Sequence, residues 1–411
     1  MIKIEQSKLD GSSLIYAIII MVLVSCLSLL VLAFWGINNR SLAVQRREAL
    51  AELYSIQGLK KIISDTVNHN MEIVTEPIVV TLSKNHWGMY DVCASVVLTS
   101  ARDTILKRIA LIGKAKNFGE DIALILENSS YSLLISDNVT IRGKSYVPGG
   151  SVRFYRNKNT ENSILSSQLF ESPVKLPEYG NMIDVQAWLR SLSNKREHGK
   201  LTISDSLNVS FAEDHVTISA DTVILEGSLS GHIMVLARQV FIRTSAKLQD
   251  AIVLASSISV DSGFSGVGQL FATKSIVIGE NVCLKYPSAV AMFPHLYGRS
   301  DMPGIILAFS LHLEGEAVLV DTNKYTNSRS RISMVDSNSV VGGIYSTSPI
   351  RFEGRCLGPI VCNSTTSNVD GNVQQNILLN TIIDASRMPD YYSYNLYFPL
   401  GKNKQVVKWL N

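Results

Sequence analysis

An uncharged, apolar run near the start of the chain constrains its fold more than any other feature. No charged residue occurs between Gly11 and Asn39. The apolar core from Leu14 to Ile37 holds about 24 residues, more than the roughly 20 that a helix needs to cross a bilayer. A secretory signal peptide has a shorter apolar region, so the length argues against cleavage, although residues 31–33 imitate a cleavage site. We therefore predict a single-pass membrane protein whose first partner is the lipid bilayer.

The charges that flank this run bear on the orientation of the chain. Lys3 and Lys8 precede the apolar segment, while Arg40, Arg46 and Arg47 follow it. Because basic flanks tend to stay in the cytoplasm, this distribution slightly favours a cytoplasmic body. The resemblance described below favours the opposite side.

Residues 38–68 continue in a helical style after the membrane segment. Their apolar residues recur at steps of three and four, which predicts an amphipathic helical stem. The residues that define this period are Leu50, Leu53, Ile56, Leu59, Ile62 and Ile63.

A short polar leader over residues 1–13, an apolar helix over 14–37 and a helical stem together resemble the N-terminus of a type IV pilin or pseudopilin. The resemblance implies that the leader is removed after a glycine, that the helix packs into a filament, and that the body lies outside the inner membrane. It makes Gly11 and Ser12 the candidate processing site. The family usually has Phe or Met after the glycine and Glu four residues later, where this chain has Ser12 and Tyr16. That departure resembles minor, tip-type pseudopilins. An ordinary signal anchor with a helical stalk is the alternative.

The remainder of the chain is rich in β-branched residues separated by Ser, Asn, Asp and Gly, which predicts strands over 69–155 and 201–388. Within 201–290 apolar triplets begin 17, 18 and 18 residues apart, at Val223, Val240, Ile258 and Ile276. Short strands in coils of about 18 residues are typical of a β-helix, in which each coil buries its apolar column on the next. Two further columns are predicted: Val235, Val253 and Phe271, and Leu229, Leu248, Val267 and Leu284. An antiparallel sandwich with evenly spaced strands is the alternative.

Other segments complete the predicted organisation. Residues 139–150 are interpreted as an earlier turn of the same array, and 291–388 as further β coils. Residues 156–200 are predicted to form a loop or linker with one short helix. The tail over 389–411 is aromatic, and its side chains either cap the end of the solenoid or dock a partner. The candidate docking residues are Tyr391, Tyr392, Tyr394, Tyr397 and Trp409.

A β-helix with short coils and small polar corners resembles the bactofilin, or polymer-forming, fold. The resemblance implies a scaffold, leaves self-assembly open and transfers no functional residue. The predicted fold class is therefore mainly β: an N-terminal transmembrane α-helix and stem, followed by a β-helix or solenoid with coils of about 18 residues.

Catalytic and metal-binding patterns are not evident in the sequence. The seven histidines are scattered and the five cysteines form no CxxC pair, although Cys356 and Cys362 are close enough to form a bridge. The residues around Gly263 lack the spacing of a nucleophile elbow or a phosphate loop. Residues 278–282 match only one unit of a hexapeptide repeat. We therefore predict no enzyme, no cofactor and no metal.

The net charge of +3, without a basic run interleaved with aromatic residues, argues against nucleic acid as a partner. The sequence thus predicts a structural or assembly component of the bacterial envelope. Its body would be periplasmic or extracellular, and its partners would be other envelope or pilin-like proteins. A cytoplasm-facing, membrane-tethered scaffold is the alternative, and a carbohydrate-active β-helix enzyme is the third.

Overall fold

The computed structural model describes residues 11–64, 71–75, 78–116, 121–136, 138–155, 164–166, 168–194, 199–294, 304–321, 330–369 and 371–410. The described chain is mainly β, with one long apolar helix near the N-terminus, as the sequence predicted. It divides into two compact units. The first unit contains residues 1–60, 71–82 and 95–107, and the second contains 61–70, 83–94 and 108–411.

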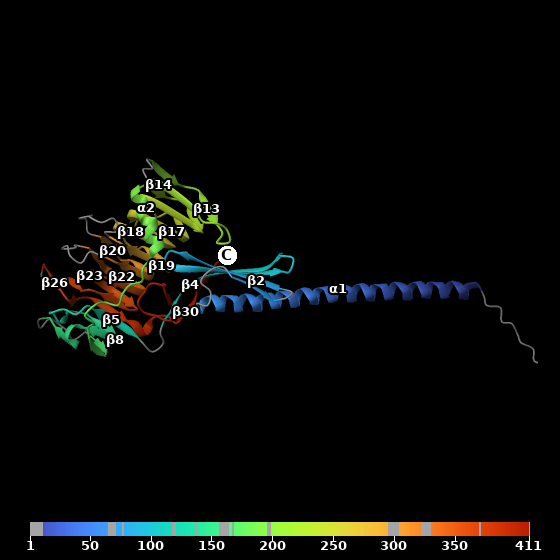
Figure 1. Ribbon diagram of the computed structural model, residues 1–411, viewed down its shortest axis with the longest axis horizontal. Coiled ribbons are helices and arrows are strands. Elements are labelled where there is room, and N and C mark those ends of the chain that lie inside the picture. Colours follow the sequence, from blue (N-terminus) through green and yellow to red (C-terminus); the bar gives the residue numbers. More distant parts are fainter. Residues whose placement is uncertain are drawn as a thin grey trace, which may run out of the picture. The chain divides into compact units, whose positions relative to one another are not determined.

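Helix α1 (Gly11–Ile63) runs for 53 residues without a break (Figure 1). At 1.5 Å per residue it is about 80 Å long. No proline interrupts it, and Ser25 and Ser28 donate their hydroxyl hydrogens to Met21 O and Val24 O at 2.8 Å each. These serines are therefore satisfied inside the helix and need no partner in an apolar environment.

The first unit packs the later turns of α1 against antiparallel strands. β1 (Met71–Thr75) pairs antiparallel with β2 (Ile78–Trp87). Ala51 and Ser55 are fully buried on α1. At Gly58 an added Cβ would lie 2.7 Å from Leu82 Cδ2 and 2.9 Å from Ser95 Oγ. The small residues of α1 thus let the helix lie close to the sheet.

Strands β3 (Tyr90–Thr99) and β4 (Thr104–Ala115) each contribute residues to both units. The second unit holds helix α2 (Ile183–Asn194), the short 3₁₀ turns η1 (Pro148–Gly150) and η3 (Ala385–Arg387), and the remaining strands. These strands are β5 (Ile122–Leu126), β6 (Leu133–Ile135), β7 (Thr140–Arg142), β8 (Lys144–Val147), β9 (Val152–Phe154), β10 (Ile164–Ser166), β11 (Leu169–Glu171), β12 (Lys200–Ile203), β13 (Ser206–Val209), β14 (Val216–Leu225), β15 (Ser228–Gly231), β16 (Ile233–Ile242), β17 (Lys247–Val260), β18 (Ser265–Ile278), β19 (Cys283–Met292), β20 (Ile305–Phe309), β21 (His312–Leu319), β22 (Arg331–Ser346), β23 (Ile350–Leu357), β24 (Ile360–Cys362), β25 (Thr366–Val369), β26 (Asn372–Gln375), β27 (Ile377–Leu378), β28 (Thr381–Asp384), β29 (Ser393–Tyr394) and β30 (Lys404–Leu410).

Most strands of the second unit pair in parallel and form three columns. The first column follows the predicted register, because Val223 pairs with Val240, Val240 with Ile258, and Ile258 with Ile276. It continues through Ile306, Ile332 and Ile350. The sequence period did not reveal this continuation, since the next two steps, from Ile276 to Ile306 and from Ile306 to Ile332, are much longer than the earlier ones.

The second and third columns are built in the same way. The second runs through Leu207, Leu229 and Leu248, and later through Leu284, Leu313, Val340, Cys356, Ile383 and Ile141. The third runs through Val235, Val253, Leu270, Val290, Ala317, Ile344, Ile360 and Leu124.

Two positions differ from the predicted columns. Leu270, and not Phe271, pairs with Val253, because Asp250 adds one residue to β17 in a left-handed conformation (φ 62°) and shifts the register. In the second column Val267 pairs with Gln249 and not with Leu248. Phe271 is buried on the opposite side of its strand.

Long strands connect the columns. β22 contributes Ile332 to the first column, Val340 to the second and Ile344 to the third. β18 pairs with both β19 and β20. β20 pairs directly with β22, and β19 is connected to β22 through β21, so the parallel pairings close into a ring. In Figure 1 the labelled strands β17, β18, β20, β22 and β23 follow one another in this unit.

The buried apolar residues form two clusters, one on the inner side of the columns and one in an outer layer. Val253 and Ala255 belong to the inner cluster, whereas Ile252 and Leu254 of the same strand belong to the outer one. The third column is therefore buried on both sides, which explains its continuous apolar runs such as residues 251–255. α2 packs on this outer side through Val185 and Leu189.

The order of the strands within the columns differs from their order along the chain. β24 pairs in parallel with β5, β5 pairs with β8, and β8 pairs with β11. Strands β5, β7, β8, β10 and β11 therefore follow the C-terminal strands, and the prediction that residues 139–150 form an earlier turn is wrong. β28 likewise lies between β23 and β7.

Candidate functional site

The apolar part of α1 is the first candidate site. Helix α1 is long and apolar enough to span a membrane. Between Leu14 and Leu50 its large apolar side chains are exposed, for example Leu30 and Phe34 at 66% and 73%. Gly11 and Ser12, the candidate processing residues, are the first two residues of α1. Residues 1–10 of the predicted leader lie outside the described residues.

The aromatic tail separates into exposed and buried side chains. Tyr391 and Trp409 are 64% and 51% exposed, whereas Tyr392 and Tyr394 are 0% and 5% exposed. Tyr397 is half-buried. Tyr392 and Tyr394, two of the candidate docking residues, are therefore buried within the fold of the chain.

The buried part of the tail packs on the outer side of the third column. The Tyr394 and Phe398 rings stack with centroids 4.8 Å apart. A Cβ added at Gly343 of β22 would lie 2.5 Å from the Phe398 ring, so the glycine makes room for it. β29 and β30 pair antiparallel with β4 beside it. The tail is thus part of the outer layer of the second unit.

A buried carboxylate, Glu316 of β21, holds this segment in place. The Asn395 backbone N donates to Glu316 Oε1 at 2.9 Å, the Asn395 side-chain amide donates to Oε2, and the Tyr392 hydroxyl donates to Oε1 at 3.4 Å. Asn395 Oδ1 in turn accepts hydrogen bonds from the backbone N of Tyr397 and Phe398 at 2.7 and 2.9 Å. Three donors therefore converge on one carboxylate.

Burial dominates the ionisation of this group. It raises the pKa of Glu316 from 4.5 to about 7, although the hydrogen bonds from Asn395 and Tyr392 act in the opposite direction. Burial, together with the charge of Glu316, also raises the pKa of Tyr90 and Tyr179 well above the usual value. Burial lowers the pKa of Lys114, whose Nζ donates to Phe398 O at 2.9 Å.

A carboxyl group that titrates near neutrality is often a catalytic acid or base. Glu316, however, is 0% exposed, and its oxygens are engaged by its own chain. Its geometry therefore serves to fasten the C-terminal segment. Glu316 was not among the predicted site residues, although the two charges of Glu314 and Glu316 within the otherwise apolar residues 313–320 were an available signal.

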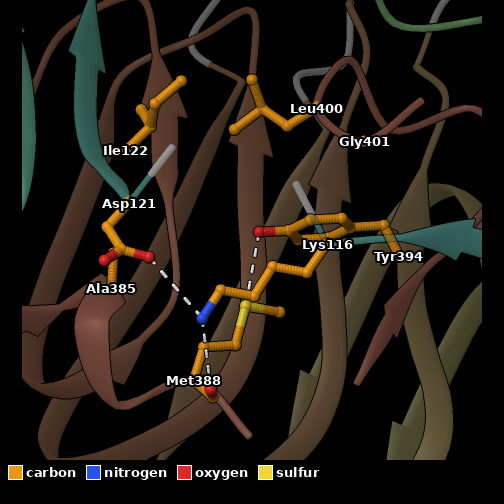
Figure 2. A pocket seen from close by; sticks show the side chains of 8 residues that line it. All are labelled: Lys116, Asp121, Ile122, Ala385, Met388, Tyr394, Leu400 and Gly401. Carbon is orange, nitrogen blue, oxygen red and sulfur yellow. Dashed lines mark hydrogen bonds and ion pairs between the residues drawn. The ribbon is translucent and has the colours of Figure 1, made fainter. Parts of the chain in front are cut away.

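A small cavity lies beside the tail (Figure 2). Lys116 Nζ lies 3.6 Å from Asp121 Oδ1 and donates to Met388 O at 3.4 Å, and the Tyr394 hydroxyl lies 3.3 Å from Met388 Sδ. The volume of about 20 Å³ is enough for a water molecule and not for a larger ligand. These contacts tie the start of β5 to the tail.

A larger groove of about 630 Å³ lies beside Tyr345 on the outer side of the third column. The Tyr345 hydroxyl donates to Pro177 O at 3.0 Å, and burial raises its pKa to about 12. The groove carries the carboxylates of Glu127, Glu178 and Asp321 together with Lys175, apolar side chains and amides. The Glu127 carboxylate accepts a hydrogen bond from the Asn363 side-chain amide.

The cysteines and metal-ligating side chains form no centre in the described part of the chain. None of the five cysteines forms a disulfide, so Cys356 and Cys362 do not form a bridge. Burial raises the pKa of both thiols, which keeps them protonated. Within the described ranges, no group of three or more His, Cys, Asp or Glu side chains is placed to hold a metal ion.

Comparison of the chain with protein-family models, with curated proteins and with solved structures finds no match.

Proposed function

We propose that this protein is a structural or assembly component of the bacterial cell envelope, held in the membrane by α1 and carrying a non-enzymatic β-helical body. The observation that carries the proposal is the continuity of α1. An exposed apolar segment passes without a break into turns that are buried against strands of the first unit. A bilayer about 30 Å thick accommodates less than half of a helix about 80 Å long.

The three parallel columns support a β-helix as the architecture of the body. Each column pairs apolar residues of successive parallel strands in register, as it does for Val240, Ile258 and Ile276. The closed ring of pairings follows from strands such as β22 that turn corners and serve all three columns. Such a body presents long flat faces and a continuous core, which suits a scaffold.

The pilin-like N-terminus supports a body outside the inner membrane, with the leader processed after Gly11. The resemblance of the β-rich sequence to the bactofilin pattern supports a scaffold role on either side. One observation favours the alternative, a cytoplasm-facing tethered scaffold: Arg40, Arg46 and Arg47 follow the apolar run directly.

The proposal is tested by the side on which the body lies. Alkaline phosphatase fused after residue 411 is active only outside the cytoplasm, and we expect activity. A fluorescent protein that matures only in the cytoplasm, fused at the same position, serves as the matched control and should stay dark. A dark phosphatase with a bright fluorescent fusion would replace the envelope proposal by the cytoplasmic scaffold.

A further inference from the structure

A second groove, of about 380 Å³, lies on the outer side of the second column. We call it the Trp409 groove. Its walls come from the successive strands β13, β15 and β17 and from the C-terminal strand β30, all in the second unit. The polar and aromatic side chains of its lining include Asn208, Ser230, Gln249, Asp250, Lys408 and Trp409. Its volume falls within the roughly 300–1,000 Å³ of small-molecule sites.

A ladder of polar side chains runs along one wall. Asn208 pairs in register with Ser230, and Ser230 with Gln249. The preceding residue on each strand is a leucine of the inner side, so the ladder residues point outward. Asn208 and Gln249 are exposed and Ser230 is half-buried. Neighbouring strands lie about 4.8 Å apart, which sets the spacing of the ladder.

These side chains have a common hydrogen-bonding character. A carboxamide carries both a donor and an acceptor, and a hydroxyl is both at once. A ligand that matches the ladder therefore offers groups that donate and accept, repeated at a spacing of about 5 Å.

An aromatic ring flanks the ladder. Trp409 remains 51% exposed although it lies on a paired strand. The Arg108 guanidinium carbon lies 5.8 Å from the centroid of the Trp409 ring, within the range of a cation–π contact. The indole of Trp409 thus presents a flat apolar surface, and its contact with Arg108 stabilises the orientation of the ring.

The lining of the Trp409 groove carries no net charge. Asp250 and Lys408 are the charged residues of its lining, and they pair with each other, since Lys408 Nζ lies 2.8 and 2.7 Å from the two carboxylate oxygens. A strongly charged ligand gains no net attraction from a lining of this kind.

We propose that the Trp409 groove binds a neutral oligosaccharide. A pyranose ring has an apolar face of C–H groups, which packs on the indole of Trp409, and its hydroxyl groups each donate and accept, as the ladder requires. Successive sugar units then lie across β13, β15 and β17. This site goes beyond the envelope role and does not depend on the side of the membrane on which the body lies.

The test is isothermal titration calorimetry of the full chain in detergent micelles with four neutral hexasaccharides: cellohexaose, maltohexaose, xylohexaose and chitohexaose. We expect at least one to bind with a Kd of about 1 mM or tighter. Trp409→Ala and, independently, Gln249→Ala should each weaken that binding by about tenfold or more. Tyr131→Ala is the matched control, because Tyr131 is 67% exposed and does not line the groove; it should leave the Kd unchanged.

Absence of binding by all four sugars at millimolar concentration would overturn the proposal. Binding that survives both groove substitutions would overturn it too, since the sugar would then sit elsewhere. Tighter binding of the anionic polymer polygalacturonate, with the same dependence on Trp409, would refute the neutral class of ligand. None of these outcomes bears on the phosphatase fusion, so the two proposals fail separately.

Discussion

Replacing Ile258 by Ala should destabilise the body strongly, because this side chain lies in the first column with Val240 and Ile276 as its register partners. Ile258 is 1% exposed. The substitution removes three carbons, which contribute about 0.8 kcal/mol each when buried, or about 2.4 kcal/mol in all. The cavity left between the strands adds a further cost, and core substitutions of this kind span about 2–5 kcal/mol. We expect a loss of about 3–4 kcal/mol.

The assay is urea unfolding of the full chain in detergent micelles, followed by far-UV circular dichroism. Ser259→Ala provides the matched control, since Ser259 is the next residue on the same strand, is half-buried and points to the other side. It should change the free energy of unfolding by about 0.5 kcal/mol or less. Equal effects of the two substitutions, or a loss below about 1 kcal/mol for Ile258→Ala, would refute the stacking of the first column.

Two further predictions concern the buried carboxylate and a backbone contact. Because the pKa of Glu316 rises from 4.5 to about 7 on folding, the native state binds more protons than the unfolded state between these values. Stability should therefore fall as the pH rises from 4.5 to 7, by about 3 kcal/mol more in the parent protein than in Glu316→Gln. Urea unfolding at pH 4.5 and pH 8 measures this, and identical pH dependence of the two proteins would contradict it. Gly342→Ala should also destabilise the body, since Gly342 has φ +146° and an added Cβ would lie 1.9 Å from a backbone oxygen of the neighbouring strand. Gly371→Ala, at φ +80° with nothing within 4 Å, is the control for backbone strain alone, and an equal fall in thermal midpoint for both would count against the close contact.

The sequence predicted the parts of the fold that leave a local pattern. The apolar run from Leu14 is continuous, so its helix could be identified by length and composition alone. The register of Val223, Val240, Ile258 and Ile276 was accessible because similar side chains recur at a nearly constant step. The packing that buries them imposes this recurrence.

The parts that were missed depend on pairings between distant segments. Ile360 pairs with Leu124, and nothing in the sequence near either residue marks this contact. The register shift at Asp250 displaced Phe271 from its predicted column, since a single extra residue in a strand is invisible to a search for a fixed period.

The candidate site was predicted only in part. The aromatic character of the tail is plain in the sequence, but burial of Tyr392 depends on Glu316 and Asn395, which lie far from each other along the chain. A tail of alternating aromatic and polar residues has the same pattern whether it docks a partner or packs on its own body. Trp409 remains exposed and is the predicted docking residue that lines a groove.

The proposed attachment of the chain to the membrane through α1 is tested most directly by alkaline carbonate extraction of isolated membranes, with detergent extraction in parallel. We expect the full-length chain to stay in the membrane pellet after carbonate and to be released by detergent. The paired substitution Leu23→Arg and Val24→Arg, which puts two charges into the exposed apolar part of α1, should shift the protein to the carbonate supernatant. Recovery of the parent chain in that supernatant, or of a shortened species that begins near Leu42, would contradict the account.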